Sequence, residues 1–175
     1  SKSLAPALRV GYAVADWQVL SRMLACKSDG GTGALDQMVI AEYFSRHFDD
    51  HIKQLAGVLR DKLDTMVEAV AREFGTAAQA VRPKGGIFLW IRLPDSVDVR
   101  KLVKPAAEAG IAFNPGPEWS CNAEAAKSHL RLCFALLSKA DIDAGIAAFA
   151  RVCHEQTGIP VHSHNVRNVR AGQPA

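Results

Sequence analysis

The sequence predicts an α/β fold, and three observations support this. Apolar residues recur at helical spacing over residues 35–74, and beyond Pro83 their period changes from 3.6 to 2. Short apolar strands then alternate with helical segments. The chain has 175 residues, of which 49% are hydrophobic. That length is sufficient for one compact domain with a sizeable core and a few peripheral helices.

The first part of the chain is expected to contain one strand and two helices. The apolar run Leu8–Val14 is typical of a buried strand. A helix is expected over residues 17–27, and three glycines then predict a loop over residues 28–33. Helical spacing of the next apolar residues predicts a second helix over residues 35–48.

A third and longer helix is predicted from Asp49, a typical N-cap residue, to about Phe74, where Gly75 ends it. Its apolar residues recur at spacings of three and four, and they are Ile52, Leu55, Leu59, Leu63, Met66, Val67 and Val70. We expect these side chains to form one buried face of the helix.

The last part of the chain alternates strands with helices. A helix over residues 99–109 contains Pro105, which costs about 3 kcal/mol in a helix interior. A final amphipathic helix is expected over residues 139–153, and a loosely ordered tail follows from Gly158. Three short strands are predicted here, over residues 87–93, 111–113 and 130–134.

Charge and cysteine usage exclude several classes of protein. The net charge of +3 arises from 21 basic and 18 acidic residues along the whole chain, which indicates a solvated surface and not a nucleic-acid footprint. The four cysteines are widely spaced, without a C-x-x-C pair, so we expect reduced thiols in a cytoplasmic protein. No apolar run approaches the roughly 20 residues that a membrane-spanning helix needs.

The opening segment SKSLAPALRVG carries the most specific motif. It resembles the S-K-x-L-x-P-x-L-R-x-G segment of fold type I aminotransferases, which use pyridoxal 5'-phosphate (PLP), especially the 2-aminoadipate and MocR-like branch. The resemblance implies that Lys2 is the catalytic lysine that holds PLP as a Schiff base and moves the α-proton. It also implies that Arg9 binds the cofactor phosphate, for which a planar guanidinium is suited, and that Ser1 reaches the same phosphate.

Two further segments resemble the same family and support the fold more than the site. PKGGIFLW at residues 83–90 is similar to the P-x-G-G-x-F-x-W segment that opens the small domain's sheet. GIAFNPG at residues 110–116 is similar to the family's G-V-x-F-x-P-G strand and turn, and Trp119 stands where the family often has Phe.

A last segment, HLRLCF at residues 129–134, resembles the family's R-L-x-F strand, whose arginine binds the substrate's α-carboxylate. The resemblance therefore implies that Arg131 is the substrate-binding residue. A bidentate arginine would fix the Cα–H bond of the substrate relative to the cofactor ring.

Together these segments resemble the C-terminal portion of a fold type I PLP-dependent transferase. The resemblance implies a remnant of the large PLP-binding domain over residues 1–48. It also implies a long bridging helix and a small α/β domain over residues 49–157, with a short sheet covered by helices, and the tail over residues 158–175. The implied activity is transfer of an amino group between an amino acid and a 2-oxo acid, by a homodimer.

Two alternatives remain open at this point. The chain is also compatible with the ligand-sensing domain of a GntR/MocR-type transcriptional regulator, which would contact nucleic acid only through an N-terminal DNA-binding domain. It is equally compatible with an isolated domain that has no activity. No metal site is expected, because His47 and His51 have helical spacing but no evident third ligand.

Overall fold

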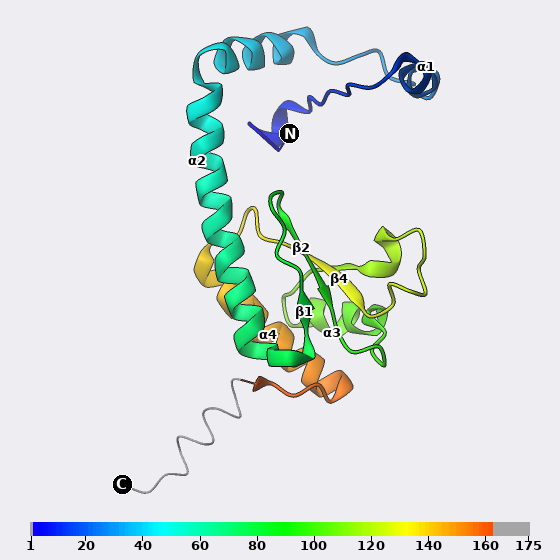
Figure 1. Cartoon of the computed structure of the whole chain (residues 1–175), viewed down its shortest axis with the longest axis vertical. Helices are drawn as coiled ribbons and strands as arrows, with labels where there is room; N and C mark the ends of the chain where they lie inside the picture. The colour runs from blue at the N-terminus through cyan, green and yellow to red at the C-terminus, as the bar shows by residue number, and fades with distance from the viewer. Residues whose placement is uncertain (1, 163–175) are drawn as a thin grey trace, which may run out of the picture. The chain divides into compact units, whose positions relative to one another are not determined.

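The computed structural model describes residues 2–162 of the chain. These residues form two compact units whose boundary lies between Ala56 and Gly57. The first unit is helical, and the second contains a four-stranded sheet with its covering helices (Figure 1). The domain boundaries predicted at residues 48 and 157 remain predictions.

The predicted strand over Leu8–Val14 is absent. Instead, a 3-10 helix covers Pro6–Leu8 and irregular structure leads to helix α1 (Trp17–Ala25). A strand forms only where another strand can pair with its backbone, and all strands of the described residues lie in the second unit. The side chains of Tyr12 and Val14 are consequently about nine-tenths exposed (93% and 88%). Helix α1 begins at the predicted residue.

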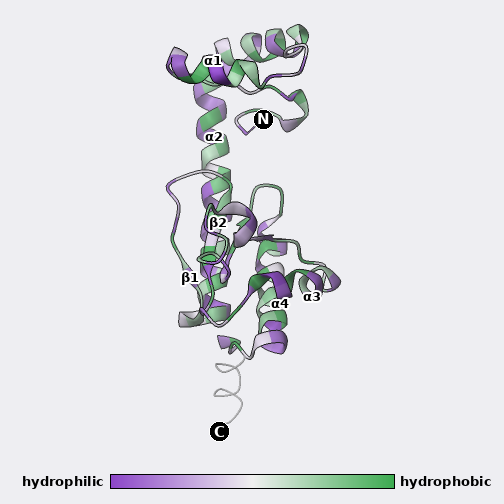
Figure 2. Cartoon of the chain, turned by 90° about the vertical axis from the view of Figure 1, so that its right-hand side faces the viewer, coloured by the Kyte–Doolittle hydropathy of each residue, from purple (hydrophilic) through white to green (hydrophobic). Residues whose placement is uncertain are grey.

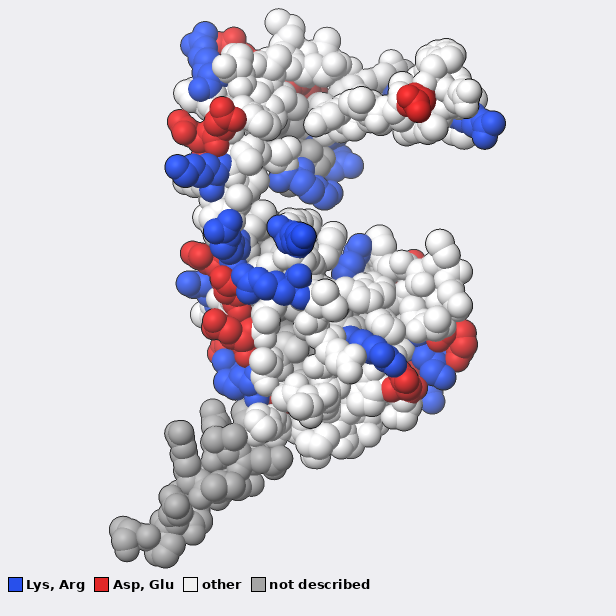
Figure 3. Space-filling view, viewed as in Figure 1, with Lys and Arg blue, Asp and Glu red and all other residues white. Residues whose placement is uncertain are grey.

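Helix α2 (Ala34–Phe74) replaces the two helices predicted on either side of Asp49. Asp49 is exposed, and an aspartate costs a helix only about 0.7 kcal/mol relative to alanine. Residues 34–56 contain no Gly or Pro that would interrupt the helix. Glu42 and Arg46 also form an ion pair one turn apart, at 2.6 Å. Acidic and basic side chains alternate along α2, at the left-hand edge of Figure 3.

The second unit is built on an antiparallel sheet with the strand order β1-β2-β4-β3. The two central strands lie where the alternating pattern predicts strands. The edge strands contain two residues each, too few for a hydrophobic pattern to reveal them. The strands are β1 (Gln79–Ala80), β2 (Phe88–Arg92), β3 (Asn114–Pro115) and β4 (His129–Cys133).

The helix predicted over residues 99–109 is divided, and the strand predicted over residues 111–113 is displaced. A 3-10 helix covers Val99–Leu102, and helix α3 (Val103–Glu108) follows it. Pro105 thus lies in the first turn of α3, where its missing N–H is not needed. The amide of Ile111 donates to the carbonyl of Ala106 (2.8 Å). That hydrogen bond closes the end of α3, so pairing begins only at Asn114.

Helix α4 (Lys139–Thr157) begins as predicted and extends beyond its predicted end. Ser138 caps it: its Oγ accepts a hydrogen bond from the Asp141 amide (3.1 Å), while the Asp141 carboxylate accepts one from the Ser138 amide (3.3 Å). This reciprocal arrangement is a capping box. Hydrophilic and hydrophobic residues alternate around α4 (Figure 2), as expected for a helix with one buried face.

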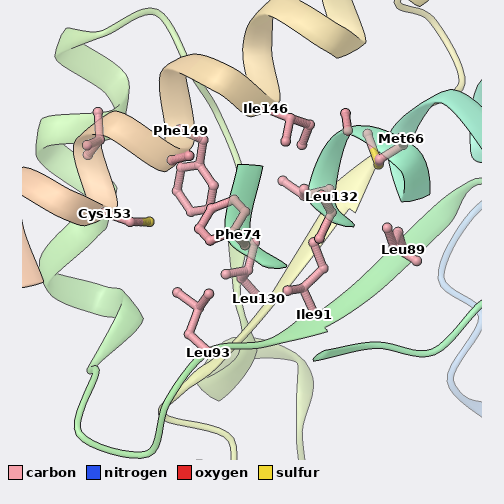
Figure 4. Close-up of a cluster of buried hydrophobic side chains, with 14 of the residues drawn as sticks. Met66, Phe74, Leu89, Ile91, Leu93, Leu130, Leu132, Ile146, Phe149 and Cys153 are labelled. Carbon is pink, nitrogen blue, oxygen red and sulfur yellow. The ribbon is translucent and has the colours of Figure 1, made fainter. Parts of the chain in front are cut away.

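The core of the second unit lies between one face of the sheet and the helices. Leu89 and Ile91 of β2 and Leu130 and Leu132 of β4 point into it. Figure 4 shows them beside side chains from residues 57–74 of α2 and from α4, among them Met66, Phe74, Ile146 and Phe149. The predicted buried face of the long helix is confirmed at Leu63, Met66 and Val70, and Leu59 and Val67 pack against the core. Ile52 and Leu55 are only half-buried.

The start of the predicted tail is part of this core. Ile159 and Val161 are both buried, because Gly158 turns the chain back with a left-handed conformation (φ 76°) after α4. His154 Nδ1 also lies 2.9 Å from the carbonyl oxygen of Ile159. Packing therefore continues to residue 161, and the remainder of the predicted tail, from residue 163, lies outside the described residues.

Candidate carboxylate-binding site

The alternation of side chains along β4 places an arginine on the face of the sheet opposite the core. Leu130 and Leu132 are buried in the core, whereas His129 and Arg131 are half-buried on the other face. Successive residues of a strand point to opposite faces. A strand that supplies two leucines to the core therefore presents Arg131 away from it.

Two aromatic rings enclose the guanidinium group of Arg131. Its Cζ atom lies 3.4 Å from the ring centroid of Trp119 and 3.9 Å from that of Phe88. Both rings therefore present a face to the guanidinium group. Cation–π attraction of this kind contributes about 0.5–2 kcal/mol per ring, depending on burial. The position of the guanidinium group is thereby restricted.

Asn114 supplies the hydrogen bond that Arg131 makes within the described residues. Arg131 Nη2 donates to Asn114 Oδ1 at 3.1 Å, and the two residues are register partners in the pairing of β3 with β4. Arg131 Nε is buried and has no acceptor among the described residues. No carboxylate of the described residues forms an ion pair with Arg131. A buried charged donor without a partner is costly unless a ligand satisfies it.

Gly116, which directly follows β3, lies close to the backbone of β4 and of the turn before it. A Cβ atom added at Gly116 would lie 2.6 Å from the carbonyl oxygen of His129 and 2.7 Å from that of Ala126. Only glycine permits this approach without movement of the backbone. The 3-10 helix Gly116–Trp119 begins at this contact and ends with the indole over Arg131.

The segments around Arg131 were recognisable in the sequence, but their roles were not. Phe88 belongs to a segment whose resemblance supports the fold more than the site, and Trp119 stands where the family often has Phe. Asn114 occupies an unspecified position of its motif, so the motif carried no signal for it. An aromatic residue in each flanking motif is the one signal that would have suggested an enclosed arginine.

The other predicted site residues belong to the first unit. Lys2 is exposed. Arg9 is also exposed, and its Nη1 donates to the carbonyl of Pro6 at 3.4 Å. Arg9 has φ 51°, the single positive φ of a non-glycine residue among residues 2–162. Such conformations cost about 1–3 kcal/mol and often occur at ligand sites. Ser1 lies outside the described residues.

The paired histidines of α2 interact with an aromatic side chain. His51 Nδ1 lies 3.1 Å from the hydroxyl of Tyr43, and the His47 ring packs against the same tyrosine. The described part of the chain contains no group of three His, Cys, Asp or Glu side chains positioned to hold a metal ion. The same residues also form no helix with the length and hydropathy to cross a membrane.

Comparison with known proteins identifies the family. The sequence model of the family described as "Aminotransferase class I and II" matches residues 1–149. The chain therefore belongs to the class I and II aminotransferases. It is 33% identical over 153 residues to the 2-aminoadipate transaminase of Thermus thermophilus, covering 86% of this chain and 38% of that protein. It is also 32% identical over 149 residues to the HTH-type transcriptional regulator YdfD of Bacillus subtilis, covering 83% of this chain and 30% of that protein.

Solved structures agree with this assignment and establish the fold type I class. The α-aminoadipate aminotransferase LysN of Thermus thermophilus, solved with N-(5'-phosphopyridoxyl)-L-leucine, has a TM-score of 0.80 at 32% identity, over 90% of this chain and 41% of that one. The kynurenine aminotransferase of Pyrococcus horikoshii has a TM-score of 0.78 at 29% identity, over 90% of this chain and 39% of that one. The chain thus spans about two fifths of the length of these proteins.

Proposed function

We propose that the protein is a PLP-dependent transaminase that moves an amino group between an amino acid and a 2-oxo acid. The observation that carries the proposal is Arg131, a half-buried guanidinium group whose Nε has no partner within the described chain. Both substrate classes carry a carboxylate, which accepts hydrogen bonds from an arginine in a bidentate geometry. Membership of the aminotransferase family supports the same reaction.

The proposed cofactor residues are Lys2, Arg9 and Ser1. The Lys2 side chain is exposed, and no hydrogen bond or ion pair occupies its amine among the described residues, which suits covalent attachment of PLP. Arg9 makes one long hydrogen bond within the chain and keeps further donors for a phosphate. PLP, when bound, supplies the electron sink that weakens the substrate's Cα–H bond. Lys2 would then act as the base that carries the α-proton.

We further propose that the protein acts as a homodimer. The first unit exposes large apolar side chains, including Tyr12 (93%), Leu35 (78%) and Trp17 (70%). Apolar surface of this extent is typical of an interface with another chain or segment. Symmetric self-association is the most common way in which soluble proteins cover it.

A second candidate function is ligand sensing in a transcriptional regulator. The observation that favours it is the similarity to HTH-type regulators, with 32% identity to YdfD of Bacillus subtilis and 30% to NorG of Staphylococcus aureus. In that case Arg131 would recognise the carboxylate of an effector, and nucleic acid would be bound by a DNA-binding domain outside residues 2–162. Multiple turnovers of an amino acid and a 2-oxo acid by the purified natural protein would favour the transaminase.

The test of the cofactor site uses the natural full-length protein and the variant Lys2→Ala. Borohydride reduction of the PLP-loaded protein should attach the pyridoxyl group to Lys2, as read by peptide mass spectrometry. The variant should lose the attached group, the visible absorbance of the bound cofactor and turnover, with unchanged far-ultraviolet circular dichroism. Lys53→Ala, an exposed lysine in the same unit, serves as the control. Attachment at another lysine would disprove the assignment.

A further inference from the structure

We propose that Asn114 is a positioning residue for the carboxylate site, and that its neutrality keeps the charge of Arg131 available to the ligand. The inference rests on the proposed role of Arg131 in carboxylate binding. It assigns a role to a residue that acts only through the arginine. The motif that contains Asn114 leaves this position unspecified, so the assignment depends on the structure.

Asn114 sets the rotation of the Arg131 guanidinium group, which the aromatic rings leave free. The Cζ atom of Arg131 lies over the rings of Phe88 and Trp119, at 3.9 and 3.4 Å from their centroids. Attraction to the two ring faces keeps the guanidinium group in place but does not by itself set its rotation. The hydrogen bond from Nη2 to Asn114 Oδ1, at 3.1 Å, defines that rotation. The Nε–H group is then left as a donor without an acceptor among residues 2–162.

The surroundings of Arg131 are neutral, which preserves its attraction for an anion. Its described partners are two ring faces and an amide oxygen. Other arginines of the unit differ: Arg92 is paired with Asp95 (2.8 Å) and Arg100 with Asp98 (2.6 Å). A carboxylate at position 114 would occupy Arg131 in the same way and would compete with the ligand. An amide provides the same acceptor atom without this competition.

A positioning role for Asn114 predicts an order of effects that a purely structural role does not. Asn114→Asp retains the acceptor and the shape of the side chain, so a structural role would leave ligand binding intact. The proposal instead expects Asn114→Asp to weaken carboxylate binding more than Asn114→Ala does. Asn122→Asp is the matched control, because Asn122 is exposed and its Oδ1 likewise accepts a hydrogen bond, from the Ala125 amide (3.1 Å).

The experiment uses the PLP-loaded natural full-length protein and propionate, a carboxylate without an amino group. Calorimetry gives its Kd for the wild type and each variant, and steady-state kinetics give KM and kcat for the amino acid. Asn114→Asp should raise the Kd and KM by about tenfold or more, the effect of one hydrogen bond to a charged group. The kcat, the cofactor absorbance and the midpoint of thermal unfolding should change little. Asn122→Asp should match the wild type.

The outcomes separate this inference from the proposed function. If Asn114→Asp binds propionate as the wild type does while Arg131→Ala does not, the role of Asn114 is wrong and that of Arg131 stands. If Asn114→Ala is weaker than Asn114→Asp, the residue is structural and the proposal is overturned. Failure of the wild type to bind propionate also overturns it. Propionate binding with the expected order but without transamination would support the inference and contradict the proposed activity.

Discussion

Gly116 approaches the backbone of His129 so closely that a Cβ atom added to it would lie 2.6 Å from the carbonyl oxygen. The obstructing atoms belong to the backbone of β4 and of the turn before it, so they cannot rotate away. Because β4 also carries Arg131, this contact links the stability of the second unit to the position of the arginine.

We therefore predict that Gly116→Ala destabilises the protein by about 1–3 kcal/mol, the usual range for overpacking. Urea unfolding followed by circular dichroism measures the change. Gly145→Ala is the matched control, since no atom lies within 4 Å of the added Cβ in helix α4. Removing a glycine from a helix interior should stabilise the protein by up to about 1 kcal/mol. Equal stability of Gly116→Ala and the wild type would contradict the close approach.

Arg131→Lys should bind PLP normally but should lose affinity for the amino acid. Lysine provides a point charge in place of the planar group held between Phe88 and Trp119. The loss in kcat/KM should correspond to about 1.5–3 kcal/mol, mainly through a higher KM. Arg92→Lys changes an exposed arginine of the same sheet, and it should leave the kinetics unchanged. A kinetically silent Arg131→Lys would disprove the assignment of the carboxylate site.

Ser138→Ala should destabilise the second unit by about 1 kcal/mol, because it removes the N-cap of α4. The Asp141 amide would lose its acceptor, and the Asp141 carboxylate would lose its contact with the Ser138 hydroxyl (2.6 Å). Thermal unfolding measures the difference. Ser96→Ala, at an exposed position in a loop, should stay within about 0.5 kcal/mol of the wild type. An equal effect of both changes would argue against the capping box.

Cys153 should resist alkylation in the native protein. Burial raises the pKa of its thiol from 9.0 to about 12, and only the thiolate reacts readily. Cys26, Cys121 and Cys133 are exposed, so iodoacetamide should modify these three first, as read by mass spectrometry. All four should react in denaturant. Early modification of Cys153 in the native protein would contradict its burial.

The same pKa shift predicts how stability depends on alkaline pH. The neutral thiol is favoured in the folded state, so its stabilising contribution is complete below pH 9.0 and is lost as the pH rises towards about 12. Cys153→Ala should therefore show a smaller decline in the free energy of unfolding over that interval than the wild type. Urea unfolding at several pH values provides the comparison. Parallel declines would show that Cys153 does not contribute.

The features predicted correctly from the sequence are those that depend on local patterns. The buried aliphatic residues of β2 and β4 alternate with polar and aromatic residues, and this alternation is enough to locate both central strands. The stripe that contains Leu63 and Met66 predicts the buried face of α2. The strand predicted at Leu8–Val14 is wrong, because the apolar character of this segment says nothing about whether a partner strand is available.

The candidate site was predicted only where a local motif identifies its residue. Arg131 lies in a specific motif, so the sequence identifies it directly. Its bond to Asn114 joins residues 17 positions apart, and it exists only because β3 pairs with β4 in one register. No property of an asparagine between Phe113 and Pro115 indicates that partner. The placement of Trp119 over the arginine likewise depends on a turn that begins at the contact of Gly116 with another strand.

The alternation along β4 also makes ligand binding a test of folding accuracy. Leu130, Arg131 and Leu132 face opposite sides in turn, so a shift of one residue against β2 would turn the arginine into the core and the leucines outwards. Such a misfolded form would keep its helices and much of its compactness but could not recognise a carboxylate. In a preparation that binds propionate, a fraction that appears folded by circular dichroism but does not bind would therefore indicate incorrect strand pairing.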